Sequence, residues 1–168
     1  MPRFRTSLAV VIAVWAILHL SGDPLGAAEA PKGLVEGPIE LDRDKSANHG
    51  PSRAKLVRVW QDGDAKHKSY TDWLKAHYGE KPILYLTVEG TPYSLLIVGG
   101  KITPLILAGT RALWRVDGFG NLYSFVTGLS VDGKRVKVVV PGGDMRHVWT
   151  LDFGQGLKLR YWEEYDGY

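Results

Sequence analysis

A histidine and an aspartate near the start of a predicted strand are the residues best placed for acid–base chemistry. His147 shares one strand face with Trp149 and Leu151, and Asp144 precedes that strand. An imidazole titrates near neutral pH, so a carboxylate beside it can make it a general acid or base. No nucleophile completes such a site, because the chain has no cysteine and no Gly-x-Ser-x-Gly motif. We keep an exported hydrolase or lyase that uses His147 and Asp144 as the alternative function.

Three candidate metal ligands lie in a polar stretch between a predicted strand and the predicted helix. Asp62, Asp64 and His67 occupy this stretch. Their spacing matches no zinc motif, and no second histidine lies close by in the sequence. We therefore predict an ordinary connecting loop here and keep a metal site as the alternative.

A second polar stretch alternates oxygen-bearing side chains, as the calcium loop of an EF-hand does. The alternating residues are Asp42, Asp44, Ser46 and Asn48. The pattern then fails, because Ala47 stands where the loop needs glycine and Arg53 where it needs a bidentate glutamate. We predict a solvated loop at this position, and neither a metal nor a cofactor for the protein.

Aromatic residues spread over the second half of the chain indicate a ligand site. In a barrel, such side chains can line an interior or a mouth that holds a small apolar ligand or stacks on a sugar ring. The alternative is that they fill the core, as aromatic residues generally do. The ligand-binding candidates are Trp114, Tyr123, Phe125, Trp149 and Tyr161.

Basic residues recur at alternate positions in the last three predicted strands. Alternate residues of a strand share a face, and neighbouring strands can align these residues side by side. We expect a basic patch with one exposed tryptophan, which would bind an anionic envelope surface such as lipid headgroups, lipopolysaccharide or acidic polysaccharide, rather than nucleic acid. A solvated outer face is the alternative reading. The residues concerned are Arg135, Lys137, Arg146, Lys158, Arg160 and Trp162.

One helix is predicted at residues 70–78. Its aromatic and apolar side chains recur with helical spacing along one stripe. Ser69 can cap the first turn, Gly79 suits the position after the last turn, and Pro82 prevents continuation. We expect the stripe, which includes His77, to pack against a sheet.

The remaining mature chain is predicted to form short strands joined by turns. A first strand is expected at residues 55–60, and the patch at residues 39–41 can form an edge strand. Strands 83–88 and 93–98 are apolar on both faces, which is typical of central strands. Strand 101–107 contains Pro104, which has no N–H to donate, so we expect an edge or a bulge there. Further strands are expected at residues 113–117, 122–127, 134–140, 146–152 and 157–163, with a turn at residues 129–133.

These elements predict a mainly β fold with one short helix. The short connections indicate an antiparallel meander of about eight or nine strands. A partly closed barrel is the preferred architecture, because closure removes exposed strand edges. A β-sandwich is the alternative.

The N-terminus predicts export. Arg3 and Arg5 precede an apolar run at residues 8–20, which is the order found in a signal peptide, and the run is too short to span a bilayer. We predict cleavage after Ala28, an extended lead-in at residues 29–53 and a β-rich domain at residues 54–168; an uncleaved N-terminal anchor is the alternative. The mature protein would then be periplasmic or secreted, with no transmembrane span.

Composition favours a binding protein over the enzyme considered above. Removing residues 1–28 takes away two of the 21 basic and one of the 18 acidic residues, so the mature chain is nearly neutral. With no cysteine, it has no disulfide to hold the fold and no site for a lipid anchor. The missing catalytic motifs therefore predict an exported, non-enzymatic binding or interaction module.

Overall fold

The computed structural model describes residues 33–80, 83–99, 103–119 and 126–167. The predicted signal peptide, Tyr123, Phe125 and most of the predicted strand at residues 122–127 lie outside these ranges. Within them the chain forms one helix, α1 (Tyr70–Tyr78), and the strands β1 (Gly37–Arg43), β2 (Ala54–Gln61), β3 (Ile83–Thr87), β4 (Tyr93–Val98), β5 (Leu105–Ala108), β6 (Ala112–Asp117), β7 (Gly128–Asp132), β8 (Arg135–Gly142), β9 (Met145–Asp152) and β10 (Lys158–Tyr165).

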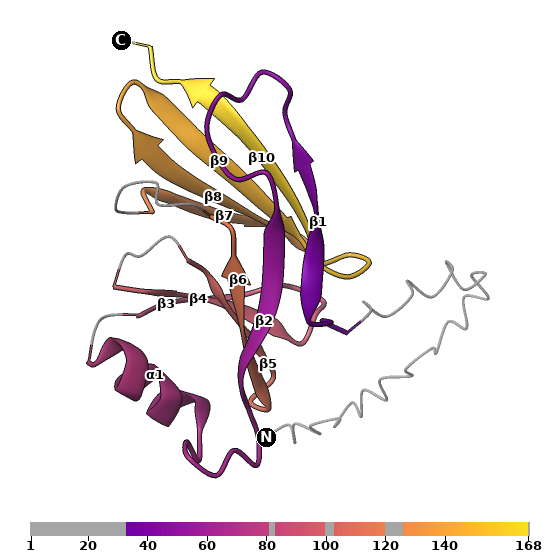
Figure 1. Ribbon diagram of the computed structural model, residues 1–168, viewed down its shortest axis with the longest axis vertical. Helices are drawn as coiled ribbons and strands as arrows, with labels where there is room; N and C mark the ends of the chain where they lie inside the picture. Colours follow the sequence, from indigo (N-terminus) through magenta and orange to yellow (C-terminus); the bar gives the residue numbers. More distant parts are fainter. Residues whose placement is uncertain (1–32, 81–82, 100–102, 120–125, 168) are drawn as a thin grey trace, which may run out of the picture.

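The described strands form one strongly curled sheet that makes a half-barrel (Figure 1). Their order is β3-β4-β5-β6-β2-β1-β10-β9-β8-β7, and every pair is antiparallel except β1 with β10. The prediction of a mainly β, mostly antiparallel meander that partly closes is confirmed. The described residues form ten strands, where eight or nine were expected for the chain.

The main core fills the concave side of the half-barrel. Both halves of the sheet contribute to it: Leu56, Val116 and Leu95 come from one half, and Val138 and Trp149 come from the other. All five side chains are almost or completely buried. Burial of apolar surface from both halves stabilises the curl, because a flat sheet would leave these faces in water.

Strand β1 joins the two halves, although an edge strand was expected for residues 39–41. Its first residues pair with β2, and residues 40–43 pair with β10 in parallel. Ile39 and Leu41 face the core, whereas Glu40 and Asp42 point outward. The edge prediction was wrong because an alternation of apolar and charged residues fits an interior strand with one solvated face equally well.

Two other strand positions also differ from the prediction. Strand β3 lies at the end of the sheet instead of its centre, and Ile83, Leu84 and Tyr85 are 42%, 50% and 53% exposed. Strand β5 lies between β4 and β6 and not at an edge, because it begins after Pro104. The Pro104 carbonyl still accepts a hydrogen bond from the Val116 N–H at 3.1 Å, so the missing proline N–H interrupts nothing.

A turn was predicted at residues 129–133, where the structure has strand β7. This strand pairs with β8 from Gly128 to Asp132. The hairpin turn is formed instead by Gly133 and Lys134, and Gly133 has a φ of +55°. Glycine adopts this left-handed backbone without strain, so the turn needs only two residues.

The predicted helix is confirmed with its bounds and caps. The Ser69 hydroxyl accepts a hydrogen bond from the Asp72 N–H at 3.1 Å, and the Gly79 N–H donates to the Lys75 carbonyl at 2.9 Å. Trp73 and Leu74 cover a second apolar cluster on the convex side of the sheet. No helix among the described residues is long and apolar enough to cross a membrane.

Candidate functional site

The outward face of β8, β9 and β10 carries the basic residues that the sequence singled out. The strand register aligns Lys158 with Asp152 and Arg135, and it aligns Arg160 with Thr150 and Lys137. Directly paired residues of neighbouring strands share a face. These side chains therefore lie together on the side of the sheet away from the core, and we call this surface the outward face.

Every one of the five basic side chains on the outward face contacts a carboxylate. Two of the partners, Glu40 and Asp42, come from β1, which lies within the lead-in segment predicted at residues 29–53. The face therefore alternates positive and negative groups and carries little net charge. The pairs are Arg135 with Asp152 at 2.8 Å, Lys137 with Glu164 at 3.7 Å, Arg146 with Asp166, Lys158 with Glu40 at 3.0 Å, and Arg160 with Asp42 at 3.6 Å.

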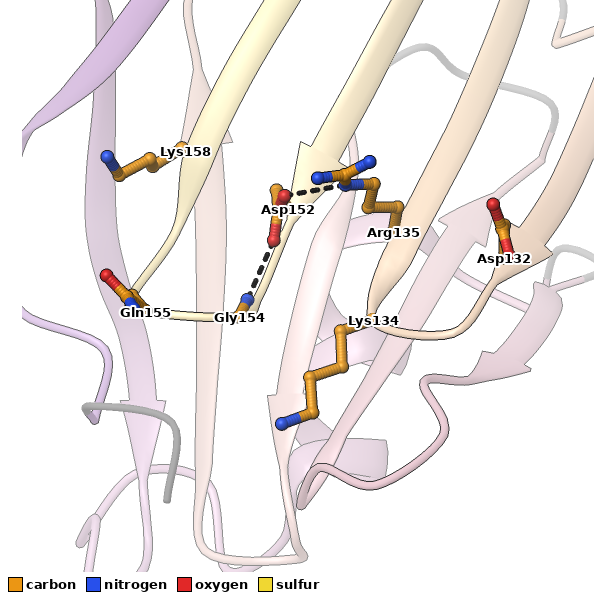
Figure 2. Close-up of a pocket in the computed structure, with 7 residues that line it drawn as sticks. All are labelled: Asp132, Lys134, Arg135, Asp152, Gly154, Gln155 and Lys158. Carbon is orange, nitrogen blue, oxygen red and sulfur yellow. Dashed lines mark hydrogen bonds and ion pairs between the residues drawn. The ribbon is translucent and has the colours of Figure 1, made fainter. Parts of the chain in front are cut away.

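Three adjoining depressions hollow the outward face around Arg135. The largest has a volume of about 530 Å³ and lies where the β7–β8 turn meets the β9–β10 connection. Figure 2 shows Lys134 and Arg135 on one side of it and Lys158 and Gln155 on the other, with Asp152 held by the Arg135 guanidinium and the Gly154 N–H. The other two, of about 380 and 210 Å³, also include Arg135.

Trp162 lines the second depression. Its indole N–H donates a hydrogen bond to Glu164 at 2.8 Å, and the Arg160 guanidinium and the Lys137 ammonium lie 5.5 and 5.6 Å from its ring centre. These cations hold the partly exposed ring in place by cation–π attraction. The result is an open trough with one aromatic side chain and alternating hydrogen-bond donors and acceptors.

Three of the aromatic residues predicted to bind a ligand are described, and they lie in the core instead of in the trough. Trp149 and Tyr161 are completely buried in the main core, where Trp149 stacks on Phe119 at 4.0 Å between ring centres. Trp114 is also buried, with the Arg58 guanidinium 5.5 Å from its ring centre. In this conformation none of the three offers an accessible surface to a ligand.

His147 is buried, and the carboxylate beside it is Glu163 and not Asp144. Asp144 is exposed in the turn between β8 and β9, where its carbonyl accepts the Asp166 N–H at 2.8 Å. The Glu163 carboxylate lies 3.9 Å from Nδ1 of His147. The sequence held one signal for this arrangement, since Glu163 alternates with Leu159 and Tyr161 and so falls on the inward face of β10.

A chain of hydrogen bonds links these buried polar groups. The Tyr161 hydroxyl donates to Glu163 Oε1 at 2.9 Å, so its oxygen accepts the Nδ1–H of His147 at 2.7 Å. The same carboxylate accepts the backbone N–H groups of His49 at 2.6 Å and Asn48 at 3.0 Å. Because these polar groups have hydrogen-bond partners, they can be buried without the free-energy cost of an unpaired donor or acceptor.

The environment shifts the pKa values of this cluster. Burial lowers the pKa of the His147 imidazole, against the attraction of Glu163. Burial alone would raise the pKa of the Glu163 carboxyl, but the Asn48 N–H, the Tyr161 hydroxyl and the His49 N–H outweigh it, so this pKa lies below its ordinary value. Burial and the hydrogen bond to Glu163 raise the pKa of Tyr161. At neutral pH the cluster therefore contains a neutral histidine and an ionised glutamate.

We expect the free energy of unfolding to be highest above pH 6.5 and to fall on acidification. The unfolded chain takes up a proton at His147 near pH 6.5, whereas the folded protein resists this because the pKa is lowered. Glu163 adds a second loss below about pH 4.5 for the same reason. Urea titrations from pH 8 to pH 4 test this, with His147→Gln expected to flatten the dependence between pH 6.5 and 5. A constant stability from pH 7.5 to 5 would contradict it.

In the loop that holds the candidate metal ligands Asp62, Asp64 and His67, the Asp64 carboxylate and the His67 carbonyl accept local hydrogen bonds. Asp64 Oδ1 accepts the Lys66 N–H at 2.7 Å and the His67 N–H at 2.9 Å, and the His67 carbonyl accepts the Trp60 indole N–H at 2.7 Å. Within the described part of the chain, no group of three or more histidine and acidic side chains is arranged to hold a metal ion.

Comparisons of this chain with protein families, with curated protein sequences and with solved structures found no match.

Proposed function

We propose that this protein is an exported, non-enzymatic binding module that takes a neutral polysaccharide on the outward face of β8, β9 and β10. The observation that carries the proposal is the open, nearly neutral trough around Arg135 and Trp162. Export rests on the signal-like residues 1–28.

The chemistry of the trough favours sugars. A sugar hydroxyl both donates and accepts hydrogen bonds, and the paired side chains of Arg135 and Asp152 offer both kinds of partner side by side. Trp162 supplies an apolar ring on which a sugar can stack. Because the three depressions adjoin at Arg135 and are open to solvent, an extended polymer fits them better than a small enclosed ligand does.

A polyanion fits the same surface less well. Each of the five basic side chains on the outward face already has a carboxylate partner, so a phosphate or sulfate would have to displace that partner. The remaining charge is small and exposed, and salt screens exposed charges within about 10 Å at 0.1 M. Attraction to an anionic envelope surface is therefore the second candidate for this face, and it predicts strong dependence on salt.

The double variant Trp162→Ala with Arg135→Ala is expected to bind neutral polysaccharide at least about tenfold more weakly than the wild type, since it removes the stacking ring and the central guanidinium, each worth about 1 kcal/mol or more. Affinity electrophoresis in gels that contain dextran, xylan or galactomannan measures the change. The matched control is Tyr165→Ala, which removes a 74% exposed aromatic residue of β10 outside the depressions and should leave binding unchanged.

Two results would overturn this assignment. The first is wild-type protein that migrates equally with and without every neutral polymer. The second is binding restricted to anionic vesicles or acidic polysaccharide and abolished by salt, which would assign the face to an anionic surface instead.

A further inference from the structure

The loop of residues 44–50, between β1 and β2, lies over the buried polar cluster. The Gly50 backbone sits against the Tyr161 ring so closely that a Cβ at this position would clash with it. The His49 ring lies edge-on to the His147 ring, with 6.0 Å between ring centres. We call residues 44–50 the cover loop, because Tyr161 and His147 are shielded from water beneath it.

The cover loop is attached at few points. Among the described residues, only Glu163 receives backbone N–H hydrogen bonds from residues 45–50 across the chain, and these come from Asn48 and His49. Arg43 Nη2 holds the loop from the β1 side by donating to the carbonyls of Ala47 at 2.7 Å and His49 at 3.0 Å. The Asp44 N–H donates to the Tyr161 carbonyl at 2.9 Å where β1 ends, and Ala47, which is 7% exposed, packs into the main core. Residues 45–50 are therefore held by Glu163, Arg43 and the Ala47 contact, and they can open without breaking the strand ladders.

We propose that acid releases the cover loop. The loop opens when the buried cluster takes up a proton, and this opening exposes the aromatic end of the core at Tyr161 and Trp149. The surface exposed in this way is apolar and aromatic, and it would accept an apolar ligand. This inference is independent of the polysaccharide face, which lies on the opposite side of the same strands.

The position of His147 supplies the driving force. Its Nδ1–H already donates to Tyr161, so a second proton must go to Nε2, which lies against the Gly142 backbone. A charge there is costly while the loop is closed, and opening lets water reach the imidazole. The open form therefore binds a proton more readily, and acid shifts the population toward it.

Four charged or titratable groups surround His147. Glu163 and Tyr161 come from β10, and protonation of the carboxylate would weaken the acceptor that ties down the loop. Arg43 on β1 brings a guanidinium group to the loop. The His49 side chain on the loop is 63% exposed, with Nδ1 3.3 Å from Glu163, and water screens the attraction between them.

Hydrogen exchange of the Asn48 and His49 amides tests the proposal on the full mature protein. After correction for the intrinsic exchange rate, we expect their protection to fall about tenfold between pH 6.5 and 5, the range in which a single linked proton acts. The Val138 and Leu151 amides, which lie within β8 and β9, should stay protected over this range. An increase in the fluorescence of an added apolar dye over the same range should report the uncovered aromatic surface.

Two variants separate the mechanism from general destabilisation. His147→Gln keeps a donor for Tyr161 but cannot gain the charge, so protection of Asn48 and His49 should become independent of pH above 5. Glu163→Gln has only one accepting oxygen, so the loop should exchange rapidly already at pH 7.5. His49→Gln, the exposed control, should still show acid release.

Either of two observations would overturn the proposal. One is protection of Asn48 and His49 that does not change between pH 7.5 and 5 in the wild type. The other is simultaneous loss of protection at Val138 and Leu151, which would mean that acid unfolds the whole sheet and does not release the loop.

Discussion

Replacing Trp149 by alanine is expected to lower the free energy of unfolding by about 3–5 kcal/mol, the range typical of a buried aromatic residue truncated to alanine. Trp149 is completely buried, between Phe119 at 4.0 Å and Tyr161 at 4.6 Å between ring centres. The two neighbouring rings cannot both move into the space left by the indole, so a cavity remains. Urea denaturation at pH 7.5, followed by circular dichroism, measures the loss.

Two matched variants serve as controls for Trp149→Ala. Trp149→Phe keeps a ring and removes an indole N–H that has no hydrogen-bond partner among the described residues, so we expect a loss of only about 1–2 kcal/mol. Trp162→Ala removes the same side chain from the outward face and should cost less than about 1 kcal/mol. Equal losses for Trp149→Ala and Trp162→Ala would show that Trp149 is not the centre of the core.

The second large effect is expected at Gly118, directly after β6. Its φ is +113°, and a Cβ there would lie 2.6 Å from the Arg53 carbonyl oxygen and 2.9 Å from the Ala54 Cα. These are backbone atoms at the start of β2, so neither can rotate away as a side chain would. We expect Gly118→Ala to cost about 2–4 kcal/mol, from backbone strain and overpacking together.

Gly133→Ala is the control for strain alone. Gly133 has a φ of +55° in the β7–β8 turn, and nothing lies within 4 Å of a Cβ built there. Its cost should be about 1 kcal/mol, the usual penalty for alanine in the left-handed region. The same denaturation experiment compares the two variants, and a loss at Gly118 no larger than that at Gly133 would contradict the close approach of β6 and β2.

Local patterns in the sequence determined the helix and most of the strands. The capping residues Ser69 and Gly79 fixed the ends of α1, because each satisfies backbone groups within its own turn. Alternation in β8, β9 and β10 placed five basic residues and Trp162 on one face, because side chains in a strand alternate with period two. These features depend on residues only a few positions apart.

Only the tertiary structure decided which strand became an edge and which charges were paired. The acids that neutralise Lys158 and Arg160 come from β1, about 118 residues earlier, through the parallel pairing of β1 with β10. The same long-range closure placed Glu163 beneath the cover loop and paired it with His147 in place of Asp144. Pairing between distant segments depends on how the whole sheet curls to bury both halves of its core, and no local spacing of residues encodes that.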